Sequence, residues 1–568
     1  MPLNNFTFLK NKTALALTAI LLAAFALRVV GISYGLPQEF IGDEFVQVAV
    51  ALKMLDEKSL LPYFPDVFYH QPLSAYVSTA GIGAYLAWQL VSGRFEGIAE
   101  MRDFYAVHST DLLLIVRFLS VLLGTAAVGL IYLAGRDLFG RRAGLLAAAF
   151  AAFDFLLVYI NHSGRVWGYM VFFVALALWA GVRLLNADRW RDYFFSAGAS
   201  FLAAANLLPG IITFVPQFVA RFSFKNRRMW LAVAALAAGL VLIFLANPRG
   251  IGTLLARFGV DVPFLTKMVF PSAAVGSHPV LESTLARFYD PFLTLLYYLP
   301  LILIFAVAGL VLLFREDRKK FWFFGSFLAA YYLFVGPFYS YGWVARALVP
   351  FVPYLALLSA YAVEKTAEKF FAGKKAAWVI LAALVILPSA ASSLRFDVLI
   401  TRPDTRTQAI DWIYANLSED SKIAVFSFTN EVVNQNREVM ELVKEVAPKE
   451  LNTRHKTLLA SGDAAFPSPR YFAWDVRDIP PGVLPAGFFG KQGFRYYLRT
   501  SWGGNSQKYL DELEGQIAEK KLLARFSPFG TDDREPYPSV HNMPRPWGPL
   551  LKAERLGPLT EIYEVKFK

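Results

Sequence analysis

The sequence contains no cysteine, so neither a disulfide nor thiol chemistry can contribute to its stability or activity. Charged residues are also scarce: they make up 18% of the 568 residues, whereas a soluble globular protein carries roughly 25%. Hydrophobic residues account for 56% of the chain. The net charge of +12 does not require a nucleic acid partner, because basic loops on one side of a bilayer produce the same excess. This composition indicates an integral membrane protein.

Strongly apolar runs recur along the first two thirds of the chain, with the roughly 20-residue length that suits membrane helices. The first run follows Lys10 and Lys12 and has no obvious cleavage site after it, so we expect an uncleaved span and not a signal peptide. The runs predict about eleven spans, near residues 13–32, 111–134, 143–160, 166–185, 192–206, 207–220, 229–246, 291–314, 321–338, 347–363 and 376–393.

The distribution of charge indicates whether the run 71–91 crosses the membrane. Lysine and arginine cluster in short loops, which the positive-inside rule places in the cytoplasm. The rule holds for every cluster only if 71–91 does not cross the membrane. We therefore predict that 71–91 lies at the outer interface, in a first external loop of about 33–110. An amphipathic interfacial helix is expected to begin at Phe45, because apolar residues then repeat at i, i+3 and i+4.

The last third of the chain has a different composition. Residues 394–568 are polar and have no run of membrane length. A helix is predicted over 404–417, strands over 422–428, 494–501 and 559–567, and a helix followed by a strand over 506–526. We expect a small α/β domain here. An odd number of spans would place this domain outside the membrane, after a transmembrane domain of residues 1–393.

Several polar residues gather on the predicted outer side. Asp43 and Glu44 follow the first span, and Arg165 and Arg346 are isolated basic residues in short outer turns. A carboxylate can accept a proton from an attacking hydroxyl or amine, and an arginine can bind a phosphate and stabilise it as a leaving group. The simpler interpretation is that the two acids cap the interfacial helix and that the arginines extend to the interface.

Five stretches resemble one family in their order and spacing. They are "GDEF" (42–45), "FYHQPLSAYV" (68–77), the two spans and outer turn over 115–170, "ARALVPFVPYLALLSA" (345–360) and "DTRTQAIDWIYANLSEDSKIAV" (404–425). Together they resemble the GT-C glycosyltransferases, in particular the branch of protein O-mannosyltransferases and lipid A aminoarabinose transferases, over roughly residues 13–430. The sequence departs from that pattern at Gln71 and Ala347, and Asn206 and Leu207 lie near the position where the family often has a lysine.

The resemblance implies an α-helical polytopic fold of the GT-C type and a donor sugar carried on a polyprenyl or dolichyl phosphate, transferred with inversion. It implies that Asp43 acts as the base or orients the acceptor, and we expect Glu44 to be a catalytic residue as well. The lipid phosphate would be held by Arg165, Arg346 and His70. Further candidate substrate contacts are His162, His278, Tyr339 and Tyr341, although aromatic residues are also expected in an interface belt.

No cofactor is expected. The oligosaccharyltransferase branch of the same superfamily uses a metal ion and has an acidic motif in the outer turn after its third span. The corresponding turn here, "NHSGRVWG" (161–168), contains no acid. This favours a metal-independent enzyme in which arginine neutralises the leaving phosphate, with a divalent cation as the alternative.

The predicted function is transfer of a sugar from a lipid-phosphate donor to a lipid, glycan or protein acceptor. We expect no nucleic acid partner. The predicted location is a prokaryotic plasma membrane. A lipid or sugar transporter is one alternative, although no inverted repeat is evident. The others are a non-catalytic scaffold built on residues 394–568 and an oligosaccharide-transferring enzyme of the same superfamily.

Overall fold

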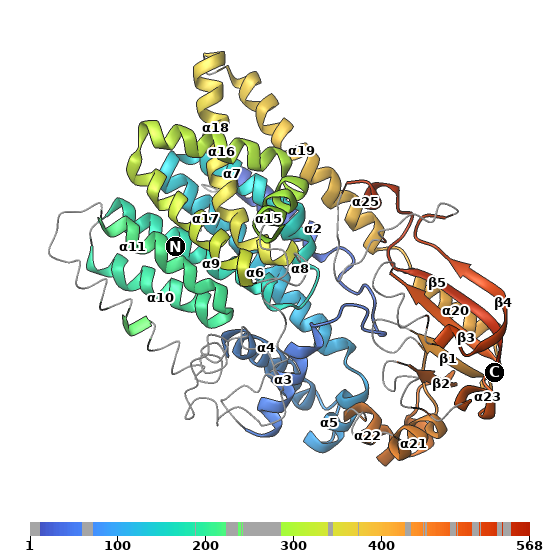
Figure 1. The fold of residues 1–568 in the computed structure, drawn as a ribbon. Coiled ribbons are helices and arrows are strands. Elements are labelled where there is room, and N and C mark those ends of the chain that lie inside the picture. Colours follow the sequence, from blue (N-terminus) through green and yellow to red (C-terminus); the bar gives the residue numbers. More distant parts are fainter. Residues whose placement is uncertain are drawn as a thin grey trace, which may run out of the picture. The chain divides into compact units, whose positions relative to one another are not determined.

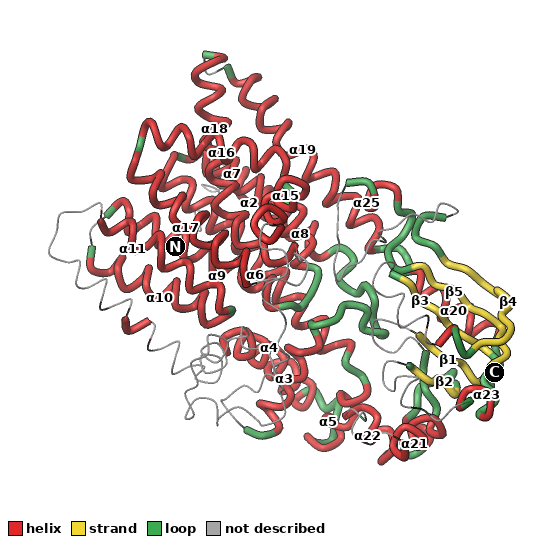
Figure 2. Tube along the Cα trace, viewed as in Figure 1, coloured by secondary structure: helices red, strands yellow, loops and turns green. Residues whose placement is uncertain are grey.

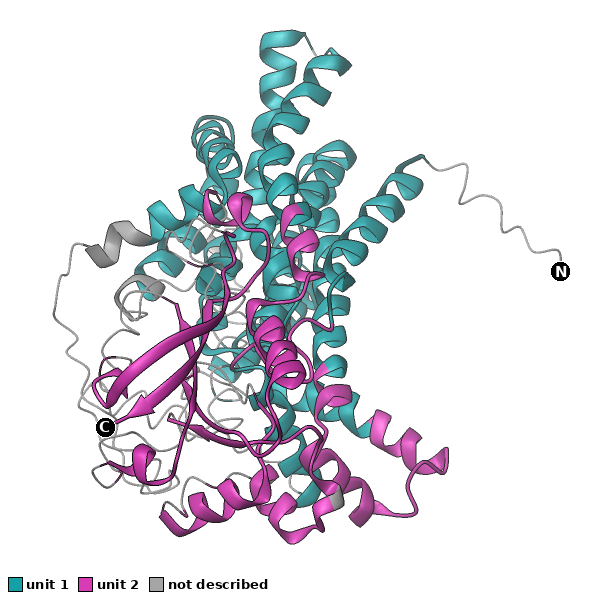
Figure 3. Cartoon of the chain, turned by 90° about the vertical axis from the view of Figure 1, so that its right-hand side faces the viewer, with its two compact units in different colours: residues 1–32, 43–83, 114–394 teal, residues 33–42, 84–113, 395–568 magenta. Residues whose placement is uncertain are grey.

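A computed structural model describes residues 12–58, 72–187, 189–222, 286–338, 345–372, 374–426, 433–446, 453–476, 487–502, 513–530 and 547–568, with isolated residues between these ranges. The chain forms two compact units (Figure 3). Unit 1 comprises Met1–Ile32, Asp43–Gly83 and Leu114–Leu394, and unit 2 comprises Ser33–Gly42, Ala84–Leu113 and Arg395–Lys568. Residues 33–42 and 84–113, which lie in the predicted first external loop, belong to unit 2 together with residues 395–568.

Unit 1 is helical (Figures 1 and 2). Its helices are α2 (Lys12–Val29), α3 (Phe45–Asp56), α4 (Pro72–Val91), α6 (Thr110–Phe139), α7 (Arg141–Ala152), α8 (Phe155–Asn161), α9 (Val166–Asn186), α10 (Trp190–Asn206), η1 (Leu208–Thr213), α11 (Phe214–Phe222), α15 (Ala286–Tyr298), α16 (Pro300–Glu316), α17 (Arg318–Phe338), η2 (Ala345–Phe351), α18 (Val352–Phe371) and α19 (Lys375–Ile400), where α4, α6 and α19 also extend into unit 2. The predicted run 229–246 falls largely outside the described residues.

Five of the described helical segments are long and apolar enough to cross a membrane, and two bent pairs bring this number to seven. The five are Lys12–Val29, Thr110–Phe139, Val166–Asn186, Ala345–Phe371 and Lys375–Asn416. These segments identify a helical integral membrane protein. The helix predicted from Phe45 is present as α3, and its interfacial position stays a prediction. Helix α4 is not among the five segments.

Two predicted spans are not straight helices. The run 143–160 is divided into α7 and α8, which meet at 54°, and the run 291–314 contains a bend of 112° between α15 and α16. At the first break, the side chain of Asp154 accepts a hydrogen bond from the backbone N of Leu157 and so begins a new helix. At the second, Pro300 has no N–H and disfavours the helical conformation for Leu299, which adopts φ −132° and ψ 50°.

Glycines allow close packing within unit 1. A Cβ on Gly135 of α6 would lie 2.8 Å from the Cα of Gly144 in α7, and a Cβ on Gly309 of α16 would lie 2.2 Å from the carbonyl oxygen of Leu358 in α18. Small residues of this kind bring helix backbones together where lipid supplies no hydrophobic driving force. Gly135 and Gly144 therefore bring α6 and α7 close together next to the turn that joins them.

Unit 2 contains a five-stranded sheet of order β2-β1-β3-β5-β4 (Figure 2). The strands are β1 (Lys422–Phe426), β2 (Phe472–Asp475), β3 (Tyr496–Ser501), β4 (Ile517–Phe526) and β5 (Leu559–Phe567), and the helices are α5 (Ile98–Val107), α20 (Thr405–Asn416), α21 (Arg437–Val446), α22 (Thr453–Ala460), η4 (Asp463–Ala465), α23 (Phe488–Lys491) and α25 (Pro549–Lys552). β1 is parallel to β2 and β3, and β5 is antiparallel to β3 and β4. The predicted helix over 404–417 and strands over 422–428, 494–501 and 559–567 match α20, β1, β3 and β5 within two residues.

A buried polar cluster fixes residues 33–42 within unit 2. The Tyr34 hydroxyl donates to the carboxylate of Asp404, which also accepts from Arg406 Nε at 2.8 Å. The Arg406 guanidinium lies over the Phe40 ring, 3.8 Å from its centroid. Because Asp404 is also the N-cap of α20, the segment that leads to Gly42 is held by the first helix of the C-terminal part.

Candidate functional site

The backbone of Asp43 has an unusual conformation. Asp43 lies two residues before the start of α3 and has a φ of +70°, in the left-handed region. This region is unfavourable for residues with a Cβ, although aspartate tolerates it better than most. The N-cap of α3 is Glu44, and its side chain makes no capping hydrogen bond. The simple capping role considered for Glu44 is therefore absent, and its carboxylate has other partners.

The Glu44 carboxylate joins three segments of unit 1. It forms an ion pair with the Arg117 guanidinium of α6, in which Nε lies 3.0 Å from Oε2 and Nη2 contacts Oε1. The same Oε2 accepts from the backbone N of Gly164 at 3.1 Å. Arg117 also donates to the carbonyl oxygen of Ile32 at 2.7 Å. Both side chains of the pair are completely buried, so the bridge ties the start of α3 to α6 and to the turn before α9.

Asp43 has a different partner. Its Oδ2 lies 2.9 Å from Nη1 of Arg346, a residue 303 positions later in η2. The Asp43 side chain is 51% exposed and that of Arg346 is 17% exposed. The structure thus brings together a predicted base and a predicted phosphate ligand, and leaves the carboxylate accessible.

Arg165 completes this group of charges. It is the N-cap of α9 and is buried. Burial lowers the pKa of its guanidinium, Arg346 lowers it further, and Tyr159, Asp43 and Glu44 raise it. Two arginines and two carboxylates therefore act on one another electrostatically in unit 1. This arrangement can hold an anionic group such as a phosphate beside a carboxylate that can accept a proton.

The turn between α8 and α9 is held by buried hydrogen bonds. Asn161 Oδ1 accepts from Arg28 Nε at 3.1 Å, and Asn161 Nδ2 donates to the carbonyl oxygen of Ser120 at 3.1 Å. Both ring nitrogens of His162 lie 2.8 Å from backbone carbonyl oxygens, those of Val158 and Val30. Its predicted role as a substrate contact stays a prediction, and the contacts present are structural.

The remaining candidates lie outside the described residues; they are His70, His278, Tyr339 and Tyr341. Among the residues that the structure does describe, no group of three or more His, Asp or Glu side chains could hold a metal ion.

The sequence reasoning missed Arg117. Its signal was a single arginine inside the apolar run 111–134, and a charge within a membrane-length segment usually has a specific partner.

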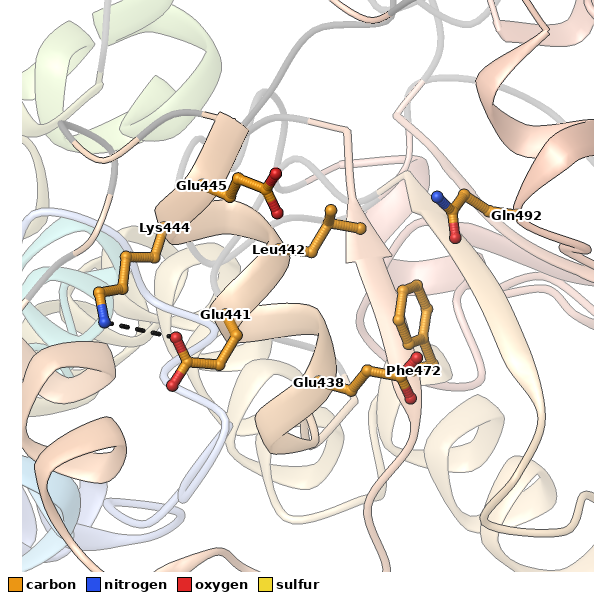
Figure 4. A pocket seen from close by; sticks show the side chains of 7 residues that line it. All are labelled: Glu438, Glu441, Leu442, Lys444, Glu445, Phe472 and Gln492. Carbon is orange, nitrogen blue, oxygen red and sulfur yellow. Dashed lines mark hydrogen bonds and ion pairs between the residues drawn. The ribbon is translucent and has the colours of Figure 1, made fainter.

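One pocket, of about 540 Å³, lies in unit 2 and contains none of the predicted residues (Figure 4). Three glutamates and Lys444 of α21 line one side of it, with Phe472 and Leu442 as its apolar members and Gln492 opposite. Lys444 pairs with Glu441 at 3.4 Å.

A family model described as "Dolichyl-phosphate-mannose-protein mannosyltransferase" matches residues 104–250. This segment includes Arg117 and Arg165 but neither Asp43 nor Arg346. The resemblance to membrane glycosyltransferases is thus confirmed over about a quarter of the chain. No curated protein matches.

Two solved structures are similar in part. The oligosaccharyltransferase AglB from Archaeoglobus fulgidus, in complex with an inhibitory peptide and a dolichol-phosphate, has a TM-score of 0.49 and 12% identity, covering 87% of this chain and 70% of that one. ArnT from Cupriavidus metallidurans, bound to undecaprenyl phosphate, has a TM-score of 0.43 and 14% identity, covering 90% of this chain and 96% of that one.

Proposed function

We propose that the protein is an inverting glycosyltransferase, which moves a sugar from a polyprenyl- or dolichyl-phosphate donor to an acceptor at the outer face of a prokaryotic plasma membrane. The observation that carries this proposal is the ion pair between Asp43 and Arg346, with Arg165 as a second cation beside it. The family match over 104–250 supports the same reaction class.

In the proposed reaction, the Asp43 carboxylate accepts the proton of an acceptor hydroxyl or amine. The acceptor atom attacks the anomeric carbon in line, the bond from that carbon to the phosphate oxygen breaks, and the lipid phosphate departs with the bonding electrons. Arg346 and Arg165, with His70 as a further proposed ligand, stabilise the charge that develops on the phosphate. Arg346 would exchange its contact with Asp43 for the phosphate when the donor binds. Glu44, buried against Arg117, positions Asp43.

The test uses the full-length protein in nanodiscs with a panel of radiolabelled polyprenyl-phosphate sugars, and membrane extract as a source of acceptors. The wild-type protein is expected to release label from at least one donor, and Asp43→Asn to lower turnover by about 10²–10⁴-fold, the usual contribution of a general base. Asp56→Asn, which removes the same charge at the end of α3, is the matched control and should keep wild-type turnover. Turnover of no donor by the wild-type protein, or full activity of Asp43→Asn, would overturn the proposal.

A further inference from the structure

Three buried amide side chains of unit 1, within the described residues, have an unpaired polar atom, and two of them are connected to the start of α9. Gln47 of α3 and Asn206 at the end of α10 are both completely buried. Gln47 Oε1 accepts from Ser78 Oγ at 3.4 Å, and Asn206 Nδ2 donates to the carbonyl oxygen of Val166 at 3.2 Å. Within the described part of the chain, Gln47 Nε2 and Asn206 Oδ1 have no hydrogen-bond partner. Such orphaned atoms are rare in native proteins and call for an explanation, such as a ligand.

Both amides are connected to the first turn of α9, which follows Arg165. Asn206 binds the carbonyl oxygen of Val166, the residue next to Arg165. Gln47 reaches the same turn through Ser78, whose Oγ lies 3.3 Å from Tyr169 Oη. On α3, Gln47 lies one turn after Glu44, and its backbone N donates to the Glu44 carbonyl oxygen at 3.1 Å. The unpaired donor therefore belongs to α3, which follows Asp43. The unpaired acceptor belongs to Asn206, which binds the start of α9 just after Arg165.

The chemistry of these atoms suits a hydroxyl group. A hydroxyl both donates and accepts, so it can satisfy an amide nitrogen and an amide oxygen alike. A phosphate only accepts, and it would be repelled by Asn206 Oδ1. The Glu44 carboxylate is already bound by Arg117 and by the backbone N of Gly164. The two unpaired amide atoms, in contrast, belong to uncharged side chains. Resting on the function proposed above, we infer that Gln47 and Asn206 are specificity-determining residues that hydrogen-bond hydroxyl groups of the transferred sugar.

The experiment measures donor discrimination by Gln47→Met and Asn206→Leu in nanodiscs. The probes are the polyprenyl-phosphate sugar that the wild-type protein turns over and each of its monodeoxy analogues. Wild-type protein is expected to use at least one analogue about tenfold less well, the effect of one lost hydrogen bond. Each variant should lose about tenfold in kcat/KM for the parent sugar and show little discrimination against one analogue. The thermal midpoint of ligand-free Gln47→Met should change little. The substitution removes an unpaired buried donor together with one long hydrogen bond from Ser78, whose Oγ keeps Tyr169 Oη at 3.3 Å.

Gln217 of α11 supplies a matched control. It is also a buried amide: its Nε2 donates to the carbonyl oxygen of Ala177 at 2.7 Å, and its Oε1 has no partner among the described residues. Ala177 lies about 16 Å along α9 from Val166, at 1.5 Å per residue, so Gln217→Leu should keep wild-type discrimination.

The inference fails if the wild-type protein accepts every monodeoxy analogue equally, or if both variants discriminate as the wild type does. It also fails if a variant loses thermal stability and loses activity equally towards the parent sugar and all analogues. Absence of turnover by the wild-type protein with every donor is a separate result, which overturns the proposed function itself.

Discussion

Asp43 and Glu44 are neighbours in sequence, and each forms an ion pair with an arginine, but the two pairs have opposite surroundings. Both members of the Glu44–Arg117 pair are completely buried, whereas the Asp43 side chain is 51% exposed. A buried pair holds its geometry because removing either charge leaves the other unpaired in an apolar environment. An exposed pair costs little to open. The Glu44 carboxylate is thus held in place in the interior, whereas the Asp43 carboxylate is accessible.

The backbone conformation of Asp43 also distinguishes it from Glu44. Asp43 adopts a left-handed φ of +70°, and such conformations persist only where the surrounding structure enforces them. The residue after Asp43 is held by Arg117 and the backbone N of Gly164. Four changes would break or sharpen this comparison.

Replacing Arg117 should have the largest effect. Arg117→Met leaves the Glu44 carboxylate buried without its cation, so we expect a loss of about 3–5 kcal/mol in the free energy of unfolding. Thermal unfolding in nanodiscs measures this as a fall in midpoint. The double variant Arg117→Met with Glu44→Gln should recover part of the loss, since no buried charge remains. An unchanged midpoint in the single variant would contradict a structural role for the buried pair.

Gly164→Ala should have the next largest effect. A Cβ on Gly164 would lie 2.4 Å from Val116 Cγ2, so the turn must move away from α6, at a cost of about 1–3 kcal/mol. The movement also displaces the backbone N that donates to Glu44. Gly198→Ala is the control, because a Cβ there meets nothing within 4 Å. Equal midpoints for the two variants would show that this contact does not constrain the turn.

Arg346→Lys tests the exposed pair. Lysine keeps the charge beside Asp43 but loses the planar fork that binds a phosphate through two hydrogen bonds. We expect kcat/KM for the lipid donor to fall about tenfold, or about 1.4 kcal/mol, while the thermal midpoint changes little because the pair is partly exposed. Steady-state kinetics over a range of donor concentrations would measure the fall. A midpoint as low as that of Arg117→Met would remove the distinction between the pairs.

The smallest expected effect concerns His162, in the turn that carries Gly164. Burial lowers the pKa of His162 to about 4, although its two carbonyl partners oppose this shift. The unfolded chain binds a proton below about pH 6.5, so the folded protein holds fewer protons between that pH and 4, and stability is lost as the pH falls through this window. His162→Gln should therefore reduce the fall in midpoint between pH 7 and pH 5. Identical slopes for wild type and variant would show that His162 does not titrate on unfolding.

Much of the fold was predictable because membrane spans depend on local hydropathy. The bends at Asp154 and Leu299 were missed because both lie in runs that remain apolar on either side, although Pro300 was a readable signal. Family motifs identified Asp43 and Arg346 separately, but their pairing depends on tertiary structure across 303 residues. Gln47 could not be distinguished from any other polar residue on an amphipathic helix until its burial was known.

The interleaving of the two units limits how the protein can be dissected. Tyr34 and Phe40 belong to the N-terminal tenth of the chain, yet they contact Asp404 and Arg406 in unit 2. In a fragment that begins at Arg395, the Arg406 guanidinium would lack the Phe40 ring and the Asp404 carboxylate would lack the Tyr34 hydroxyl. In the remaining N-terminal fragment, the segment 33–42 that precedes Asp43 would lack these two partners. A cut before Arg395 therefore does not yield two self-sufficient parts, and complementation of the two fragments in trans should require residues 33–42 to rebind.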